Sequence, residues 1–69
     1  MFKFDMTTEC NYASFHDNET GRIVHVDSFD NVEFNAWITR GDEYLQLGSF
    51  KAESNDSLNS TLNKLVNNK

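Results

Sequence analysis

The chain of 69 residues has no proline, three glycines and one cysteine. Because Cys10 has no second cysteine to pair with, a disulfide-stabilised miniprotein is excluded, and we expect a reducing, cytoplasmic compartment. The glycines stand apart at Gly21, Gly41 and Gly48, so they form no glycine-rich phosphate-binding loop. No run approaches the roughly 20 apolar residues of a membrane-spanning helix. The length allows one domain, 1–69, and excludes Rossmann-fold and TIM-barrel enzymes.

Basic residues are also scarce. Six Lys and Arg stand against 11 Asp and Glu, which gives a formal net charge of −5 at pH 7. A basic clamp for nucleic acid and a polybasic membrane-binding surface both need cationic residues, so we expect neither direct nucleic-acid binding nor membrane binding. A net charge of this size is also ordinary for a small soluble domain. The charge therefore argues against these two classes of function, but it does not assign a function to the chain.

Aromatic residues, in contrast, are plentiful: six Phe, two Tyr and Trp37. Each aromatic side chain buries a large area, so a short chain can build a core from few of them. This composition argues against intrinsic disorder. A domain this small retains little net stability after the chain entropy is subtracted, so self-association or a partner is a reasonable expectation.

The hydrophobic pattern predicts strands first and a helix last. Alternating residues and turn signals predict five strands, over about 1–7, 11–16, 22–27, 32–40 and 43–50. The spacing of Leu58, Leu62, Leu65 and Val66 predicts an amphipathic helix over about 55–67, with Ser54 as its N-cap. The remaining helix positions are rich in Asn and Ser, which are poor helix formers, so the helix depends on docking its apolar stripe.

Together these elements predict a fold of the α+β class. It consists of a small antiparallel β-sheet of four to five strands, with one C-terminal amphipathic helix packed on one face. A small barrel with an appended helix is the alternative.

The hairpin between 32 and 50 is the best-determined unit. Gly41-Asp42 is typical of a two-residue type II′ loop. This loop sets a register with the pairs Arg40–Glu43, Ile38–Leu45, Ala36–Leu47 and Phe34–Ser49. In that register one face of the hairpin is apolar, and the other carries Trp37, Tyr44 and Phe50.

The sequence offers little for catalysis or metal binding. Cys10, His16 and His25 lie six and nine residues apart, whereas zinc ligands usually come in pairs two to four residues apart. Cys10 has no basic group close in sequence, and the carboxylate pairs fall in predicted turns, where solvent keeps them ionised. We therefore expect no cofactor, no metal and no enzymatic activity.

The face with Trp37, Tyr44 and Phe50 is the most informative feature, and two interpretations of it remain open. It is either a second core layer, covered by the N-terminal strand or the first hairpin, or a surface that binds a partner. Trp and Tyr are over-represented among the residues that dominate binding energy in interfaces. The partner-binding prediction comprises Trp37, Tyr44 and Phe50 with the carboxylates of Asp30, Glu33, Asp42 and Glu43.

No family motif is matched. In size, acidity and Asn/Phe usage the chain is similar to small accessory proteins of phages and mobile elements, among them anti-CRISPR and anti-restriction inhibitors. Our leading hypothesis is a non-enzymatic inhibitor that binds a basic groove of a host protein or ribonucleoprotein, at its nucleic-acid site. The alternatives are a homodimeric structural or regulatory module that uses the Trp37/Tyr44 face, and a single-stranded nucleic-acid binder.

Overall fold

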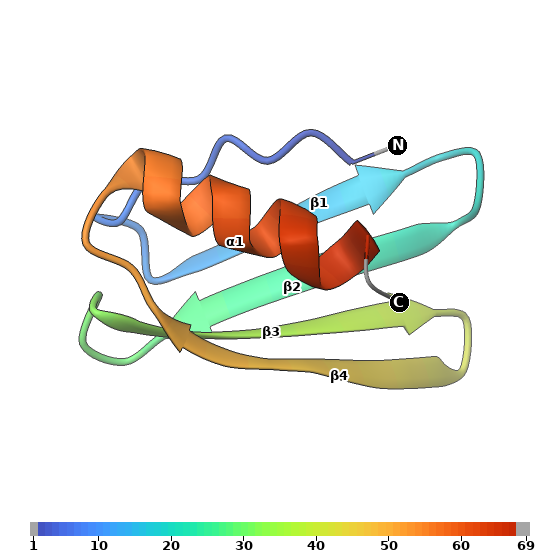
Figure 1. The fold of residues 1–69 in the computed structure, drawn as a ribbon. Helices are drawn as coiled ribbons and strands as arrows, with labels where there is room; N and C mark the ends of the chain where they lie inside the picture. Colours follow the sequence, from blue (N-terminus) through green and yellow to red (C-terminus); the bar gives the residue numbers. More distant parts are fainter. Residues whose placement is uncertain (1, 68–69) are drawn as a thin grey trace.

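A computed structural model describes residues 2–67 and contains one antiparallel sheet and one helix (Figure 1). The elements are β1 (Tyr12–Asp17), β2 (Arg22–Ser28), β3 (Glu33–Arg40), β4 (Glu43–Lys51) and α1 (Asn55–Asn67). The strands lie in the order β1-β2-β3-β4, and α1 crosses one face of the sheet. The predicted α+β class is therefore confirmed. No helix within the described residues is long and apolar enough to cross a membrane.

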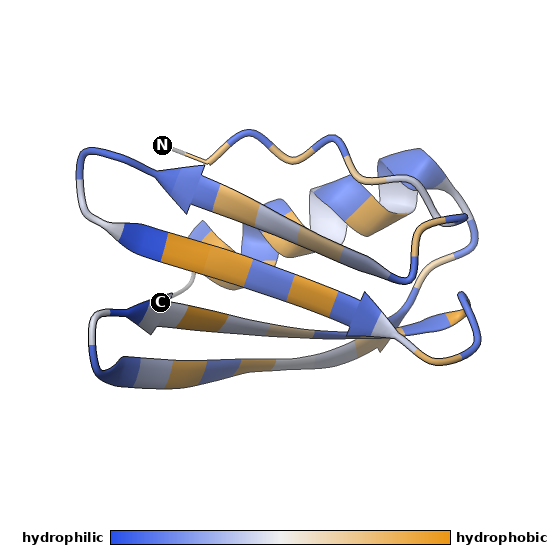
Figure 2. Ribbon diagram, turned by 180° about the vertical axis from the view of Figure 1, so that it is seen from behind, coloured by the Kyte–Doolittle hydropathy of each residue, from blue (hydrophilic) through white to orange (hydrophobic). Residues whose placement is uncertain are grey.

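The core lies between α1 and the face of the sheet that α1 covers. Every second residue of β2 and β3 is buried there, and the helix contributes residues at i, i+4 and i+8: Val24, Val26, Phe34, Ala36, Ile38, Leu58, Leu62 and Val66. Figure 2 shows the same strands from behind, with hydrophobic and hydrophilic segments alternating along them. The buried residues therefore follow from the hydrophobic periodicity of each element, which is two in the strands and about four in the helix.

The start of α1 is set by its N-cap. The backbone N–H of Ser57 donates to Oγ of Ser54 at 3.1 Å, and this bond satisfies one of the helix's free donors. Asp56 in the first turn and Lys64 in the last turn complement the helix dipole. The predicted helix and its cap are both confirmed.

The strand predicted over 1–7 is wrong: residues 2–7 are extended but form no strand, while Met1 lies outside the described residues. The predicted alternation is still present, since Met6 is buried and Phe2 and Phe4 are half-buried. What differs is the partner of the backbone. Oδ1 of Asn59 accepts from the Met6 N–H and Nδ2 of Asn59 donates to the Met6 carbonyl, both at 2.9 Å.

A second asparagine of the helix extends this arrangement. Oδ1 of Asn55 accepts a hydrogen bond of 2.8 Å from the backbone N–H of Thr8. Four residues of helix advance by about 6 Å and two extended residues by about 6.6 Å, so Asn55 and Asn59 match Thr8 and Met6 in register. The asparagines that lower helix propensity therefore bind the N-terminal segment, which lies beside α1 in both views (Figures 1 and 2).

The β3–β4 hairpin follows the predicted register only near its loop. Gly41 has the positive φ, 59°, that the predicted loop requires, and the pairs Arg40–Glu43 and Ile38–Leu45 are present. Beyond Trp37 a β-bulge inserts one residue into β4, so the predicted partners Leu47 and Ser49 are replaced. The observed pairs are Ala36–Gly48 and Phe34–Phe50.

This bulge turns Phe50 toward the core. A shift of one residue moves a side chain to the opposite face of the sheet. The Phe50 ring stacks on Phe34 with ring centroids 6.0 Å apart, and it packs against the core. The prediction that Phe50 shares a face with Trp37 is therefore wrong. Gly48, with φ of 131°, supplies the backbone conformation at the bulge.

Candidate protein-binding face

The sheet face away from α1 has no covering layer within residues 2–67, as the two ribbon views show (Figures 1 and 2). We call it the open face. By register and alternation it carries these residues: Tyr12, Ser14 and His16 of β1; Ile23, His25 and Asp27 of β2; Glu33, Asn35, Trp37 and Thr39 of β3; Tyr44, Gln46, Ser49 and Lys51 of β4. The interpretation of this face as a second core layer is therefore wrong, because α1 and the N-terminal segment both lie elsewhere.

Trp37 lies at the centre of the open face and is held by a stack. The His25 imidazole lies parallel to the indole, with ring centroids 5.3 Å apart and an angle of 10° between the planes. Both ring nitrogens of His25 have partners: Nδ1 lies 3.3 Å from the Tyr12 hydroxyl and Nε2 lies 2.8 Å from Oγ1 of Thr39. Since a hydroxyl can donate or accept, these two contacts satisfy either tautomer of the ring. The indole thus rests on a ring whose orientation is fixed.

A second polar chain orders the β4 side. The Tyr44 hydroxyl donates to Oε1 of Gln46 at 2.5 Å, and Nε2 of Gln46 donates to Oδ1 of Asn35 at 2.6 Å. The same Asn35 oxygen accepts from the Ser49 hydroxyl at 3.2 Å. Two exposed tyrosines flank the half-buried Trp37. Tyr44 is 63% exposed and Tyr12 is 55% exposed. Rigid aromatic groups with polar tips are typical contact residues of protein interfaces.

The predicted partner-binding residues divide between several places. Trp37, Tyr44 and Glu33 lie on the open face, whereas Phe50 belongs to the core side. Glu43 lies on the α1 side, where Oε1 accepts from Nη2 of Arg40 at 3.0 Å. Asp42 occupies the β3–β4 turn, and Asp30 lies in the β2–β3 loop.

Asp30 has a structural role in its loop. Its Oδ1 accepts from the backbone N–H of Glu33 at 2.9 Å and of Val32 at 3.0 Å. These hydrogen bonds hold the pKa of Asp30 below its ordinary value, and the bond from Glu33 has the larger effect. The carboxylate thereby closes the loop that precedes β3.

Sequence reasoning missed the contribution of the first hairpin to this face. Tyr12, His25 and Thr39 converge around Trp37 only because β1, β2 and β3 pair in one register, with His25 opposite both Ser14 and Trp37. The position of the Asp17–Gly21 turn predicts Ala13 or Tyr12 opposite His25, and this prediction is wrong, because Ser14 lies there. The alternation of β2 correctly predicted that His25 lies on the face away from Val24 and Val26. It could not predict the cross-strand partner, because the register between strands is a non-local property.

The open face also holds one contact between a hydroxyl group and an imidazole. The Thr39–His25 contact pairs a hydroxyl with a base, as nucleophilic catalysis requires. However, a tyrosine rather than a carboxylate orients the imidazole, and the pair lies on an open sheet surface rather than in an enclosed pocket. Within residues 2–67 no group of three or more His, Cys, Asp or Glu is placed to hold a metal ion.

Comparison with known proteins assigns no family: no family model matches the chain, and no curated protein or solved structure shows significant similarity to it. The geometry of the open face is therefore the basis for the function proposed below.

Proposed function

We propose that this chain is a non-enzymatic protein-binding module that contacts its partner through the open face. The observation that carries the proposal is the His25–Trp37 stack, an ordered aromatic group at the centre of a sheet face that no other segment of residues 2–67 covers. Fixing an indole costs side-chain entropy. Because the stack orders Trp37 in the free chain, less entropy is lost when a partner binds. A pre-ordered Trp with flanking tyrosines supports a contact of moderate size with a well-defined centre.

The partner is proposed to carry a basic surface. The net charge of −5 favours approach of a cationic protein over approach of nucleic acid. Among the predicted carboxylates, we assign this contact to Glu33, which lies on the open face opposite Lys51, and to Asp42, which is exposed in the β3–β4 turn. Glu43 and Asp30 already have partners within the chain.

The narrower form of the proposal is an inhibitor of phage or mobile-element type, of the anti-CRISPR or anti-restriction kind. In it, the open face covers the nucleic-acid site of a basic host protein or ribonucleoprotein in the cytoplasm. The support for this form is the size and acidity of the chain, together with an ordered contact face whose strand residues include one Lys or Arg, Lys51. Competition with nucleic acid is then the mechanism of inhibition.

Affinity capture with a matched set of variants tests the proposal. The bait is the full chain as wild type, Trp37→Ala, Asp42→Lys or Phe29→Ala, where Phe29 is a fully exposed aromatic residue of the β2–β3 loop. Trp37→Ala is expected to weaken the captured complex by about 30-fold, the loss typical of a central interface residue. Asp42→Lys should chiefly slow association, and Phe29→Ala should bind as the wild type does.

The captured protein then decides between the forms of the proposal. An inhibitor must displace DNA or RNA from that purified protein, and Trp37→Ala must fail to do so. If Trp37→Ala and Phe29→Ala capture the same proteins equally well, the open face is not the interface. Sedimentation of the chain alone tests the homodimer, and titration of Trp37 fluorescence with oligonucleotides at low salt tests the nucleic-acid binder.

A further inference from the structure

A pocket opens on the α1 side of the sheet, at the end where the β1–β2 and β3–β4 turns lie. Its lining is formed by Arg22, Ile38, Arg40, Glu43, Tyr44 and Leu45. Leu45 is 45% exposed there, which leaves apolar surface open beside charged groups. The pocket lies behind the open face, and Tyr44 at the edge of the sheet contributes to both.

The pocket brings together both arginines of the chain. Ile23 of β2 pairs with Thr39 of β3, and the next step of this antiparallel register places Arg22 beside Arg40. Like charges in directly opposite cross-strand positions destabilise a sheet. Two guanidinium groups thus lie side by side at one end of the sheet, with Asp17 opposite Arg22 and Glu43 opposite Arg40 in the register.

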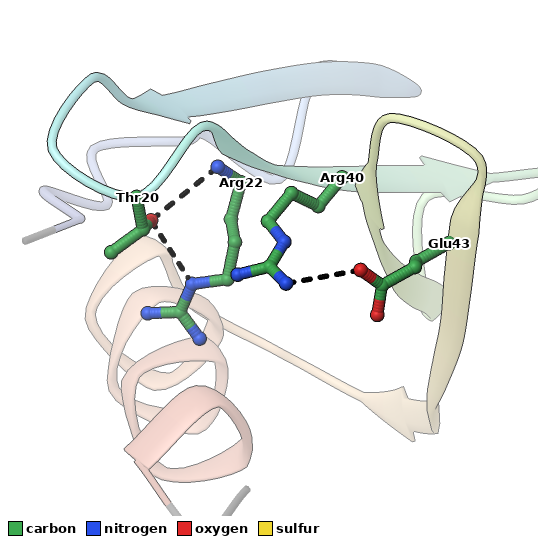
Figure 3. A network of polar contacts seen from close by, with 4 residues as sticks. All are labelled: Thr20, Arg22, Arg40 and Glu43. Carbon is green, nitrogen blue, oxygen red and sulfur yellow. Dashed lines mark hydrogen bonds and ion pairs between the residues drawn. The ribbon is translucent and has the colours of Figure 1, made fainter.

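Each guanidinium is held at present by a group of its own (Figure 3). Nε of Arg22 donates to Oγ1 of Thr20 at 3.2 Å, and its guanidinium carbon lies 5.3 Å from the centre of the Phe2 ring. Nη2 of Arg40 donates to Oε1 of Glu43 at 3.0 Å. The Arg40–Glu43 pair is open to solvent, since the two side chains are 54% and 73% exposed.

We propose that this pocket binds a single carboxylate group carried on a small apolar body. Guanidinium groups bind carboxylates through paired, charge-assisted hydrogen bonds, and Arg40 needs only to exchange one carboxylate for another. Such an exchange costs little, because an exposed ion pair contributes little stability. The apolar body would lie against Ile38 and Leu45.

The charge of the chain selects against more highly charged ligands. Glu43 lines the pocket and the net charge is −5, so a dianion such as phosphate is repelled more strongly than a monoanion. Phosphate also gains nothing from the apolar wall. The structure thus favours benzoate over both acetate and phosphate as probes.

Titration of the full chain with sodium benzoate, acetate and phosphate at one ionic strength tests the proposal. The readout is the NMR resonances of the two arginine Nε–H groups. Benzoate is expected to shift both resonances with a dissociation constant on the order of millimolar, as befits a ligand of this size. Acetate and phosphate should bind more weakly. Equal affinity for acetate and benzoate overturns the apolar part of the proposal.

Variants at the pocket sharpen the test. Glu43→Gln removes the competing carboxylate and should tighten benzoate binding about two- to fivefold. Arg40→Gln should abolish saturable binding, with circular dichroism confirming that the variant is folded. Lys51→Gln, at the far end of β4, serves as the charge-matched control and should bind as the wild type does. Absence of any arginine shift with benzoate, or unchanged binding by Arg40→Gln, overturns the proposal.

Discussion

The imidazole of His25 lies flat against the indole of Trp37, at 5.3 Å between ring centroids and 10° from parallel. The two residues are direct cross-strand partners on β2 and β3. His25 is held in turn by Tyr12 from β1 and by Thr39 from β3. Three strands thus cooperate to order one indole ring on a face that carries no second layer in the part of the chain that the structure describes.

This relationship predicts that His25→Ala loosens Trp37 without unfolding the chain. Loss of the stack and of two hydrogen bonds should lower the free energy of unfolding by about 1–2 kcal/mol. Trp37 should also gain mobility and exposure to water. We expect a red-shifted emission maximum and a lower fluorescence anisotropy. His16→Ala, an exposed histidine of the same face, should leave both signals unchanged; if the two variants behave alike, the stack does not order the indole.

The second prediction concerns the hydrogen bonds between α1 and the N-terminal segment. Asn59→Ala removes both bonds to the Met6 backbone, so unfolding should become easier by about 1–3 kcal/mol. Asn63→Ala is the matched control, because Asn63 lies one helical turn further along and is exposed; its Oδ1 accepts a surface hydrogen bond of 3.2 Å from Nδ2 of Asn67. Both substitutions raise helix propensity equally, and the control also loses that surface bond, so the difference between them is a lower bound on the contact with Met6.

Hydrogen exchange locates that effect. The Met6 amide should exchange faster in Asn59→Ala, whereas the amide of Leu62 in α1 should keep its protection until global unfolding. A Met6 amide that exchanges equally fast in the wild type and in Asn59→Ala would show that Asn59 does not hold the segment.

The elements that could be predicted from sequence are those with local signals. The alternation in β2 and β3, the apolar stripe of α1 and the cap at Ser54 each act within a few residues. The N-terminal segment shows the limit of such signals. Its alternation correctly indicated which side chains turn inward, but the partner of its backbone is Asn59, 53 positions away from Met6.

The candidate site divides in the same way. Trp37 and Tyr44 follow from the type II′ loop and the alternation next to it, so their shared face could be predicted. Phe50 lies beyond the bulge, and a single inserted residue reverses its direction. The local hint for this bulge was Gly48, since an isolated glycine in a strand often marks one.

The bulge provides the third prediction. Gly48 has φ of 131°, and an added Cβ would meet no atom within 4 Å, so substitution there strains the backbone without a steric clash. Gly48→Ala should therefore destabilise the chain by about 1–3 kcal/mol. Ser49→Ala, on the neighbouring residue, should cost less than half of that. Urea denaturation of both variants measures the difference, and equal midpoints would show that the bulge does not depend on glycine.

The last prediction concerns the β2–β3 loop in acid. Because hydrogen bonds from Glu33 and Val32 hold the pKa of Asp30 below its ordinary value of 3.8, the folded state favours the ionised carboxylate. Its contribution to stability is therefore complete above the ordinary value and disappears as the pH falls through the lowered pKa. The amide resonances of Val32 and Glu33 should shift together in that acidic window. In Asp30→Asn the side-chain oxygen still accepts hydrogen bonds but no longer titrates, so the coupled shift should vanish while the loop persists. A coupled shift that survives in Asp30→Asn would assign the titration to another group.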